Sequence, residues 1–150
     1  IHTRMLLSIP ERIDTQLLNT LKSLSKQIIL VTHCNHPNEL GPELKQSFTA
    51  LREAQVTLLN QSVLLKQVND NADTLKDLSL ALFDLGILPY YLFMFDRVNG
   101  AAHFEVNETD SMEIYQQLLT KLPGYLVPRL SQEIPGERYK SLATLRTSSR

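Results

Sequence analysis

Hydrophobic and polar positions along the chain change their period several times, and each change predicts a new element. Residues 27–32 form a short β-branched run that is apolar on both faces, as in a buried parallel strand. Residues 42–54 then place Leu44, Phe48 and Leu51 at helical spacing, with charged residues on the opposite face. The first pattern is therefore a strand followed by a helix.

Further strands follow at intervals. They are predicted over residues 56–59, 87–95 and 125–130. The second strand is followed by a polar loop that begins at Asn60. Pro128 lacks the backbone N–H of a strand interior, so the last strand is expected at a sheet edge or a bulge.

Helices alternate with these strands. Besides residues 42–54, they are predicted over residues 9–24, 71–85 and 110–122. In the helix over 71–85, Phe83 is expected to face inward with three leucines, and Gly86 ends the helix in a left-handed turn. Thr109 or Asp110 is expected to cap the next helix.

The alternation of strands and helices predicts an α/β fold in which parallel strands are joined by crossover helices. The helix over 9–24 would follow a strand that ends near His2 and Arg4. Residues 141–150 are rich in Ser, Thr and Arg. We therefore predict one folded region over 1–140 and a flexible tail over 141–150.

Composition and charge narrow the function. The 150 residues carry 15 Lys and Arg against 16 Asp and Glu, a net charge of -1 that argues against nucleic-acid binding. The apolar runs are shorter than the roughly 18 residues of a membrane span, so no membrane partner is expected. Cys34 is the single cysteine, which favours a reducing, cytoplasmic environment. The first residue is Ile1 rather than Met, so we expect a fragment of a longer protein.

Polar side chains gather where the predicted strands end, which is where parallel α/β folds bind ligands. His33, Gln61, Asp96 and Glu133 stand at or beyond such ends and suit a polar, charged small molecule, although such residues also cap loops. Asp96 and Glu133 are either an acidic pair for an ammonium group or ordinary surface carboxylates. Lys140 is either a Schiff-base lysine, as pyridoxal phosphate requires, or a solvated lysine.

Other candidate groups have plainer interpretations. His33 and His36 lack a carboxylate or cysteine partner at fixed spacing, so we favour hydrogen bonding over metal binding. Cys34 is either a nucleophile or a small buried apolar side chain, and we predict the latter. His103 stands in a small-residue turn, where close packing and ligand contact both stay open.

Five blocks of the sequence are distinctive: residues 32–39 (THCNHPNE), 58–70 (LLNQSVLLKQVND), 88–96 (LPYYLFMFD), 100–104 (GAAHF) and 124–128 (GYLVP). In this order and spacing they resemble the lysine 2,3-aminomutase family of radical S-adenosylmethionine (SAM) enzymes. Residues 82–91 and 133–137 are most similar to the bacterial enzymes that make β-lysine for elongation factor P. The resemblance implies the C-terminal half of a partial (β/α) barrel of the radical SAM type.

The resemblance also implies a substrate, cofactors and residue roles. The family converts L-lysine to β-lysine with SAM, a [4Fe–4S] cluster and pyridoxal 5′-phosphate (PLP), while the protein binds and orients these groups. Lys140 aligns with the lysine that holds PLP. Asp96 and Glu133 align with two acidic positions that hold the substrate ε-ammonium. His33 and Gln61 align with polar residues that line the SAM pocket.

The chain also departs from the family pattern. The three-cysteine cluster motif is absent from these residues, so we expect the cluster ligands in a missing N-terminal half and no turnover by this piece alone. Arginines for the substrate carboxylate and the cofactor phosphate are expected to be missing as well. Gln55 replaces a common Gly before the second strand. Ser141 and Leu142 replace Thr-Pro after Lys140, which alters the surroundings of that lysine.

We therefore expect part of a lysine 2,3-aminomutase whose β-lysine serves to modify elongation factor P. Two alternatives stay open: a metabolic lysine 2,3-aminomutase that makes free β-lysine, and a short non-catalytic relative that binds PLP or a nucleotide. An exposed sheet edge is expected where further strands would pair, and such an edge favours association into homo-oligomers.

Overall fold

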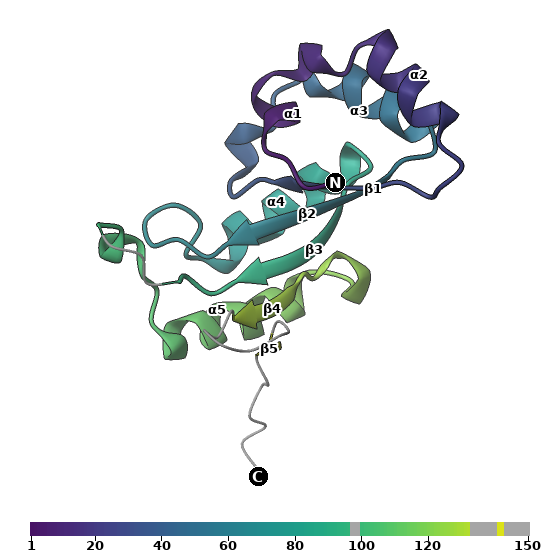
Figure 1. The fold of residues 1–150 in the computed structure, drawn as a ribbon. Coiled ribbons are helices and arrows are strands. Elements are labelled where there is room, and N and C mark those ends of the chain that lie inside the picture. Colours follow the sequence, from purple (N-terminus) through teal and green to yellow (C-terminus); the bar gives the residue numbers. More distant parts are fainter. Residues whose placement is uncertain (97–99, 133–140, 143–150) are drawn as a thin grey trace.

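Five strands form one mixed sheet in the computed structural model, which describes residues 1–96, 100–132 and 141–142. Their spatial order is the chain order, β1-β2-β3-β4-β5 (Figure 1). The parallel strands are β1 (Ile29–His33), β2 (Thr57–Val63), β3 (Leu88–Phe93) and β4 (Arg129–Gln132). The short β5 (Ser141–Leu142) runs antiparallel to β4. The predicted α/β fold with parallel strands is confirmed.

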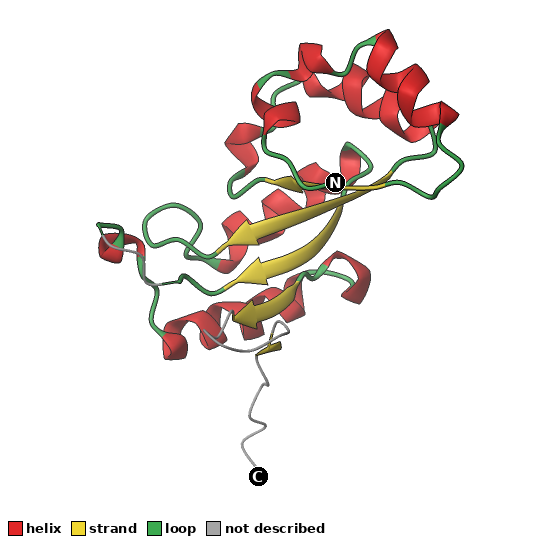
Figure 2. Cartoon of the chain, viewed as in Figure 1, coloured by secondary structure: helices red, strands yellow, loops and turns green. Residues whose placement is uncertain are grey.

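Helices connect the parallel strands, and α4 and α5 lie behind the sheet in the view of Figure 2. The α-helices are α1 (Met5–Ser8), α2 (Thr15–Ser23), α3 (Leu44–Glu53), α4 (Ala72–Asp84) and α5 (Glu108–Lys121). Single turns of 3-10 helix are η1 (Pro10–Arg12), η2 (Pro37–Glu39), η3 (Ala102–Phe104) and η4 (Gly124–Leu126). Among the described helices, none combines the length and the hydropathy that a membrane-spanning segment requires.

Asparagines cap the two longest helices. Asn71 begins α4 and accepts a hydrogen bond from the Thr74 backbone N–H at 2.8 Å. Asn107 begins α5 and accepts from the Asp110 N–H at 2.9 Å. The prediction that Thr109 or Asp110 caps this helix was wrong, because Asn107 is an equally good cap and Asp110 lies in the first turn, where a negative charge is favourable.

Other element boundaries also differ from the predicted ones. The loop expected from Asn60 is the second half of β2, because pairing with both β1 and β3 holds the strand as far as Val63. The last strand begins at Arg129 rather than at residue 125, since residues 124–126 form η4. The single helix predicted over residues 9–24 is divided into η1 and α2, and α1 lies before this range. Pro10 opens η1 because its ring cannot continue the preceding helix.

The N-terminal residues run parallel to β1. The Val31 backbone N–H donates to the Ile1 carbonyl at 2.8 Å, and the Thr3 N–H donates to the Val31 carbonyl at 3.0 Å. His2 pairs with Val31 as an isolated parallel bridge. The segment before α1 is therefore extended beside the sheet, at the place where the sequence predicted a strand end.

The predicted tail over 141–150 starts within β5, because Ser141 and Leu142 pair with Gln132 and Ser131 of β4. Residues 143–150 lie outside the described residues. A division of the chain at residue 140 therefore stays a prediction.

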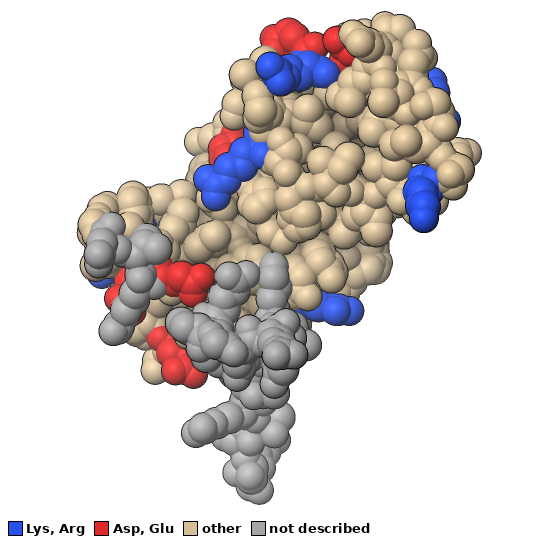
Figure 3. Space-filling model, in the orientation of Figure 1, with Lys and Arg blue, Asp and Glu red and all other residues tan. Residues whose placement is uncertain are grey.

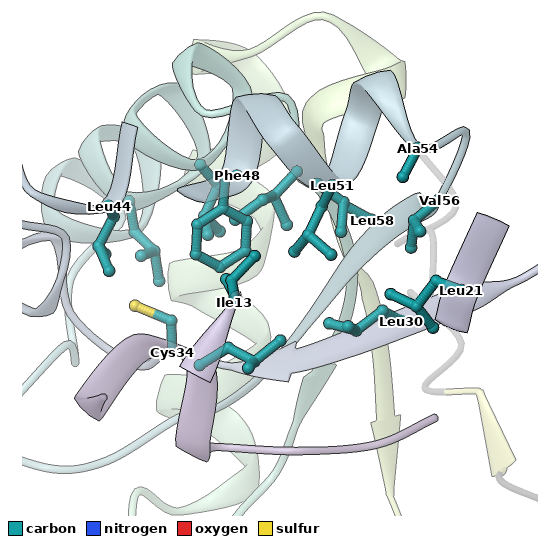
Figure 4. Packing of buried hydrophobic residues seen from close by; sticks show 14 residues of the cluster. Ile13, Leu21, Leu30, Cys34, Leu44, Phe48, Leu51, Ala54, Val56 and Leu58 are labelled. Carbon is teal, nitrogen blue, oxygen red and sulfur yellow. The ribbon is translucent and has the colours of Figure 1, made fainter. Parts of the chain in front are cut away.

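Two apolar clusters lie between the helices and the sheet. In the first, Leu44, Phe48 and Leu51 of α3 are fully buried against β1 and β2, as their helical spacing predicted (Figure 4). In the second, Leu92 of β3 and Leu118 of α5 are fully buried. Each such side chain contributes about 1.5–3 kcal/mol to folding, so the clusters fix the helices on this face.

Phe83 was expected in this core, and that prediction was wrong. Its side chain is exposed on α4, and its ring centroid lies 6.2 Å from that of the exposed Tyr125. Leu82, the preceding residue, is fully buried instead. Leu82 continues the buried row of Leu75 and Leu78, whereas Phe83 lies about 100° further round α4 and outside that row.

Side chains of the central strands alternate between the two faces of the sheet. Asn60 and Ser62 of β2 face the helices, whereas Gln61 and Val63 face the other side. That other side lacks covering helices in the view of Figure 1. The space-filling view of the same side shows mostly uncharged residues, with charged ones toward the margins (Figure 3). Gln61 and Val63 thus face a side of the sheet on which, among the described residues, no helix packs.

Two turns use left-handed backbone. Gly86 follows α4 with a φ of 77°, as predicted, and its N–H donates to the Phe83 carbonyl at 2.8 Å. Gln55 lies between α3 and β2 with a φ of 60°. This conformation suits glycine, so Gln55 carries backbone strain that a glycine would avoid.

Candidate functional site

A pocket of about 320 Å³ lies where β1, β2 and β3 reach their carboxyl ends. Its polar lining consists of Arg4, His33, Asn35, Gln61 and Asp96. Its apolar lining consists of Val63, Phe93, Met94 and Phe95. Parallel α/β sheets bind ligands at this edge, so the pocket lies where the polar strand ends predicted a site.

Strand register places the pocket residues beside one another. His33 of β1 lies opposite Gln61 of β2, and Gln61 lies opposite Tyr91 of β3. The pairing of β2 with β3 shifts between Asn60 and Gln61, so Tyr90 has no partner in the register. This irregularity turns Tyr91 toward the face that carries Gln61.

The structure brings three of the five predicted site residues together. His33, Gln61 and Asp96 all line the pocket, although they come from three different strand ends. Glu133 and Lys140 lie outside the described residues. The acidic pair and the PLP lysine therefore stay predictions, while the shared location of the other three residues is a finding.

Arg4 also lines the pocket, and sequence analysis did not single it out. It occupies the N-cap position of α1, directly after the segment that runs beside β1. The expectation that the arginines for the substrate carboxylate and the cofactor phosphate are missing stays a prediction. The sequence could have indicated Arg4 as a site residue, because a strand is predicted to end near it and ligands bind at strand ends.

Aromatic rings continue the open face beside the pocket. The rings of Tyr91 and Phe93 stack with centroids 5.3 Å apart. The Tyr90 hydroxyl donates to that of Tyr91 at 3.5 Å, and this bond raises the pKa of Tyr90. The Arg129 guanidinium lies 5.9 Å from the centre of the Tyr90 ring. The Tyr90 ring is tilted by 58° against the Tyr91 ring, so the stacked pair of Tyr91 and Phe93 is the part that suits packing against a planar ring.

Ser131 of β4 is fully buried and lies opposite Phe93 in the strand register. Within the part of the chain that the structure describes, its Oγ has no hydrogen-bond partner. Ser131 does not line the pocket.

Cys34 plays no chemical part in the pocket. It is fully buried in the first apolar cluster, and its thiol donates to the His36 carbonyl at 3.4 Å. Burial raises the pKa of the thiol from 9.0 to about 12. A thiol that stays protonated is a poor nucleophile and a poor metal ligand, which confirms the predicted buried, apolar role.

His36 caps η2. The His36 Nδ1 accepts a hydrogen bond from the Asn38 backbone N–H at 3.1 Å. The backbone N–H of His36 donates to Glu39 Oε1 at 2.8 Å. Within the described ranges, no three side chains of His, Cys, Asp or Glu are grouped as a metal site would require. The hydrogen-bonding interpretation of His36 is confirmed.

A second hollow, of about 560 Å³, lies between the loop after β2 and the start of α5. Its charged lining consists of Lys66, Asp70, Glu105, Asp110 and Glu113. The described residues that the resemblance links to catalysis line the smaller pocket instead. The pocket at the strand ends is therefore the better candidate site.

Comparison with known proteins identifies relatives in sequence. No protein-family model matches the chain. The chain is 50% identical over 141 residues to L-lysine 2,3-aminomutase of Escherichia coli (strain K12), which covers 94% of this chain and 41% of that protein. It is 49% identical over 142 residues to L-lysine 2,3-aminomutase of Haemophilus influenzae, covering 95% and 42%. Identity to the enzyme of Clostridium subterminale is 38% over 128 residues, covering 85% and 30%.

A solved structure supports the fold. A radical SAM methyltransferase from Sphaerobacter thermophilus superimposes with a TM-score of 0.57 over 78% of this chain and 37% of that protein, at 15% sequence identity. At this identity the match concerns the fold alone. The chain spans about two fifths of the length of the first two relatives. Over nearly its whole length, this chain is thus related in sequence to the lysine 2,3-aminomutases, and its strands and helices are arranged as in a radical SAM enzyme.

Proposed function

We propose that this chain supplies the ligand-binding C-terminal part of a lysine 2,3-aminomutase, which converts L-lysine to β-lysine. The observation that carries the proposal is the pocket at the strand ends, because it unites His33, Gln61 and Asp96 in a chain about half identical to such enzymes. Each of these residues has a role in the family that the resemblance names. Their common location supports the assignment of those roles as a set.

Asp96 is proposed to bind the substrate. Its carboxylate, together with that of Glu133, would accept charge-assisted hydrogen bonds from the ε-ammonium of lysine. An amino acid with a neutral side chain would offer these carboxylates no charge-assisted hydrogen bond, so it would bind less tightly. Arg4 supplies a guanidinium in the same pocket, which suits a carboxylate or phosphate group of a ligand.

His33 and Gln61 are proposed to contact SAM, and Lys140 to hold PLP. The paired positions of His33 and Gln61 allow both side chains to hydrogen-bond the same ligand. The stacked rings of Tyr91 and Phe93 fit a planar group beside them. When bound, SAM and PLP supply the radical and the conjugated ring that nitrogen migration needs, while these side chains orient them and exclude water.

The residues of this chain do not fit a [4Fe–4S] cluster. Such a cluster needs several cysteine thiolates, whereas Cys34 is the single cysteine and its pKa is raised to about 12. No role in holding the cluster is therefore assigned to these residues. The cluster belongs to the proposed full-length enzyme, in the reducing conditions of the cytoplasm.

The proposed activity is tested with the full-length protein, purified without oxygen and reconstituted with iron, sulfide, SAM and PLP. With a reductant present, L-lysine should be converted to β-lysine, which amino-acid chromatography separates from lysine. Unchanged lysine in a preparation that binds SAM and contains a complete cluster would refute the proposal.

We propose further that the β-lysine is used to modify elongation factor P. Support comes from residues 82–91, which are most similar to the enzymes of that pathway. Cells that lack the protein should then contain elongation factor P without the β-lysyl group, which intact-mass spectrometry detects. Loss of free β-lysine with fully modified elongation factor P would instead identify the metabolic enzyme.

A further inference from the structure

Two buried asparagines connect the loops behind the pocket. Asn60 is 1% exposed and Asn69 is 0% exposed, and every polar atom of both side chains is hydrogen-bonded. Burying an asparagine side chain costs free energy unless its amide is hydrogen-bonded, and both of these amides are fully hydrogen-bonded beside the pocket.

Asn60 extends the pairing of β1 with β2 beyond the last strand residue. Its Oδ1 accepts from the Cys34 backbone N–H at 2.9 Å, and its Nδ2 donates to the Cys34 carbonyl at 3.0 Å. Thr32 Oγ1 donates to the same Oδ1 at 2.9 Å, and Nδ2 donates to Ser62 Oγ at 2.9 Å. The side-chain amide thus takes the place of a peptide group and holds the backbone directly after His33.

Asn69 holds the next residue in the same way. Its Nδ2 donates to the Asn35 carbonyl at 2.8 Å and to the Val63 carbonyl at 2.9 Å. Its Oδ1 accepts from the Leu65 N–H at 2.7 Å. The Asn35 side chain completes the connection, because its Oδ1 accepts from the Val63 N–H at 2.8 Å.

These bonds join the two walls of the pocket. His33 at the end of β1 and Asn35 two residues later line one wall, and Gln61 and Val63 of β2 line the other. Residues that carry the amide contacts, Cys34 and Asn60, alternate with them on the opposite face. The separation of the two walls is therefore set by hydrogen bonds to the backbone, whose geometry is more restrictive than apolar packing.

We propose that Asn60 and Asn69 are positioning residues: through the backbone of Cys34 and Asn35 they hold His33 in register with Gln61, and so set the affinity of the pocket for its ligand. This inference rests on the proposed function for the identity of that ligand, SAM. Neither asparagine lines the pocket, so both act through the residues they hold.

The test replaces the Nδ2 amide group of each asparagine with a carboxylate oxygen. Asn60→Asp keeps the acceptor for Cys34 and Thr32 but loses both donated bonds, and Asn69→Asp makes the matching change in the second amide. Leu118→Ala is the control, because it removes a fully buried side chain of α5 from the second cluster. All variants are made in the full-length protein and are ranked by the fall in melting temperature.

We expect Asn60→Asp and Asn69→Asp to weaken SAM binding, measured by calorimetry at pH 8, by about tenfold or more. Leu118→Ala, at an equal or larger fall in melting temperature, should weaken it by less than about threefold. Equal loss of affinity in all three variants, or none in the Asp variants, overturns the inference.

A second measurement does not need the ligand. Hydrogen–deuterium exchange in peptides that cover residues 33–36 and 61–65 should rise in the Asp variants, with no change in α5. Unchanged exchange in these peptides also overturns the inference. If wild-type protein fails to bind SAM but exchange rises as expected, the proposed function fails and the positioning role stands. If Asn60→Asp does not fold, Asn69→Asp decides the outcome.

Discussion

His33 and Gln61 lie directly opposite each other in the register of two parallel strands, with both side chains lining one pocket. Gln61 is in turn paired with Tyr91, so it occupies the centre of a row that crosses three strands. A ligand that contacts either His33 or Gln61 is therefore within reach of the other. This arrangement makes the strand ends a single site rather than separate loop contacts.

Replacement of Asp96 should affect lysine more than SAM. Asp96→Asn removes the charge that pairs with the ε-ammonium, so the KM for lysine should rise by about 10- to 100-fold. The Kd for SAM should change little. Asp84→Asn, an exposed change on α4, is the matched control and should alter neither constant. Equal losses for both ligands would show that Asp96 maintains the pocket rather than selecting lysine.

Replacement of Lys140 should remove bound PLP. In the full-length protein, Lys140→Ala should lose the visible absorbance of protein-linked PLP, since that linkage needs the lysine amine. Lys22→Ala, at an exposed position on α2, should keep it. A retained absorbance band in Lys140→Ala would mean that a different lysine holds the cofactor.

The Cys34 thiol should be unreactive in the folded protein. Because burial raises its pKa to about 12, the thiolate is scarce at pH 8, and the side chain is also inaccessible. A disulfide reagent should therefore modify Cys34 only after a denaturant is added. The neutral thiol also gives a pH dependence: its contribution to stability is complete below pH 9.0 and is lost as pH rises toward about 12. Cys34→Ala should abolish that slope, and fast labelling of the native protein would contradict the burial.

A glycine at position 55 should stabilise the protein. Gln55→Gly removes a left-handed backbone strain at φ 60°, so the free energy of unfolding should rise by about 0.5–1 kcal/mol. The control is Gln46→Gly, at an exposed position in the first turn of α3, which should lower it by about 0.5–1 kcal/mol. Denaturant titration measures both changes. The same sign for both variants would show that the turn carries no strain.

Alanine at position 86 should have the opposite effect. Gly86 has a φ of 77°, and a Cβ there would collide with the Arg52 side chain. Gly86→Ala should therefore lower the free energy of unfolding by about 1–2 kcal/mol. Gly124→Ala, where a Cβ meets no atom within 4 Å, should change it by less than about 0.5 kcal/mol. A loss no larger than that of Gly124→Ala would contradict the left-handed turn.

Local sequence patterns predicted the elements correctly where residues close together in the chain determine the structure. The spacing of Leu44, Phe48 and Leu51 predicted α3 because a helix buries one face every 3.6 residues. Gly86 marked the end of α4 because its conformation depends on the residue itself. Phe83 and the cap of α5 were predicted wrongly, since neighbouring residues competed for the same role and only packing chose between them.

By itself the sequence determined the alternation of strands and helices along the chain, because hydrophobic periodicity is a local property. That alternation in turn predicted parallel strands and the edge where a ligand would bind. Tertiary structure decided that Asn60 belongs to a strand, that Gln61 lies opposite His33, and that Arg4 reaches the same pocket. These facts depend on pairing between segments far apart in the chain. From sequence alone a polar residue such as Asn60 is predicted to lie in a loop. In the folded protein its side chain hydrogen-bonds the Cys34 backbone, which follows the neighbouring strand.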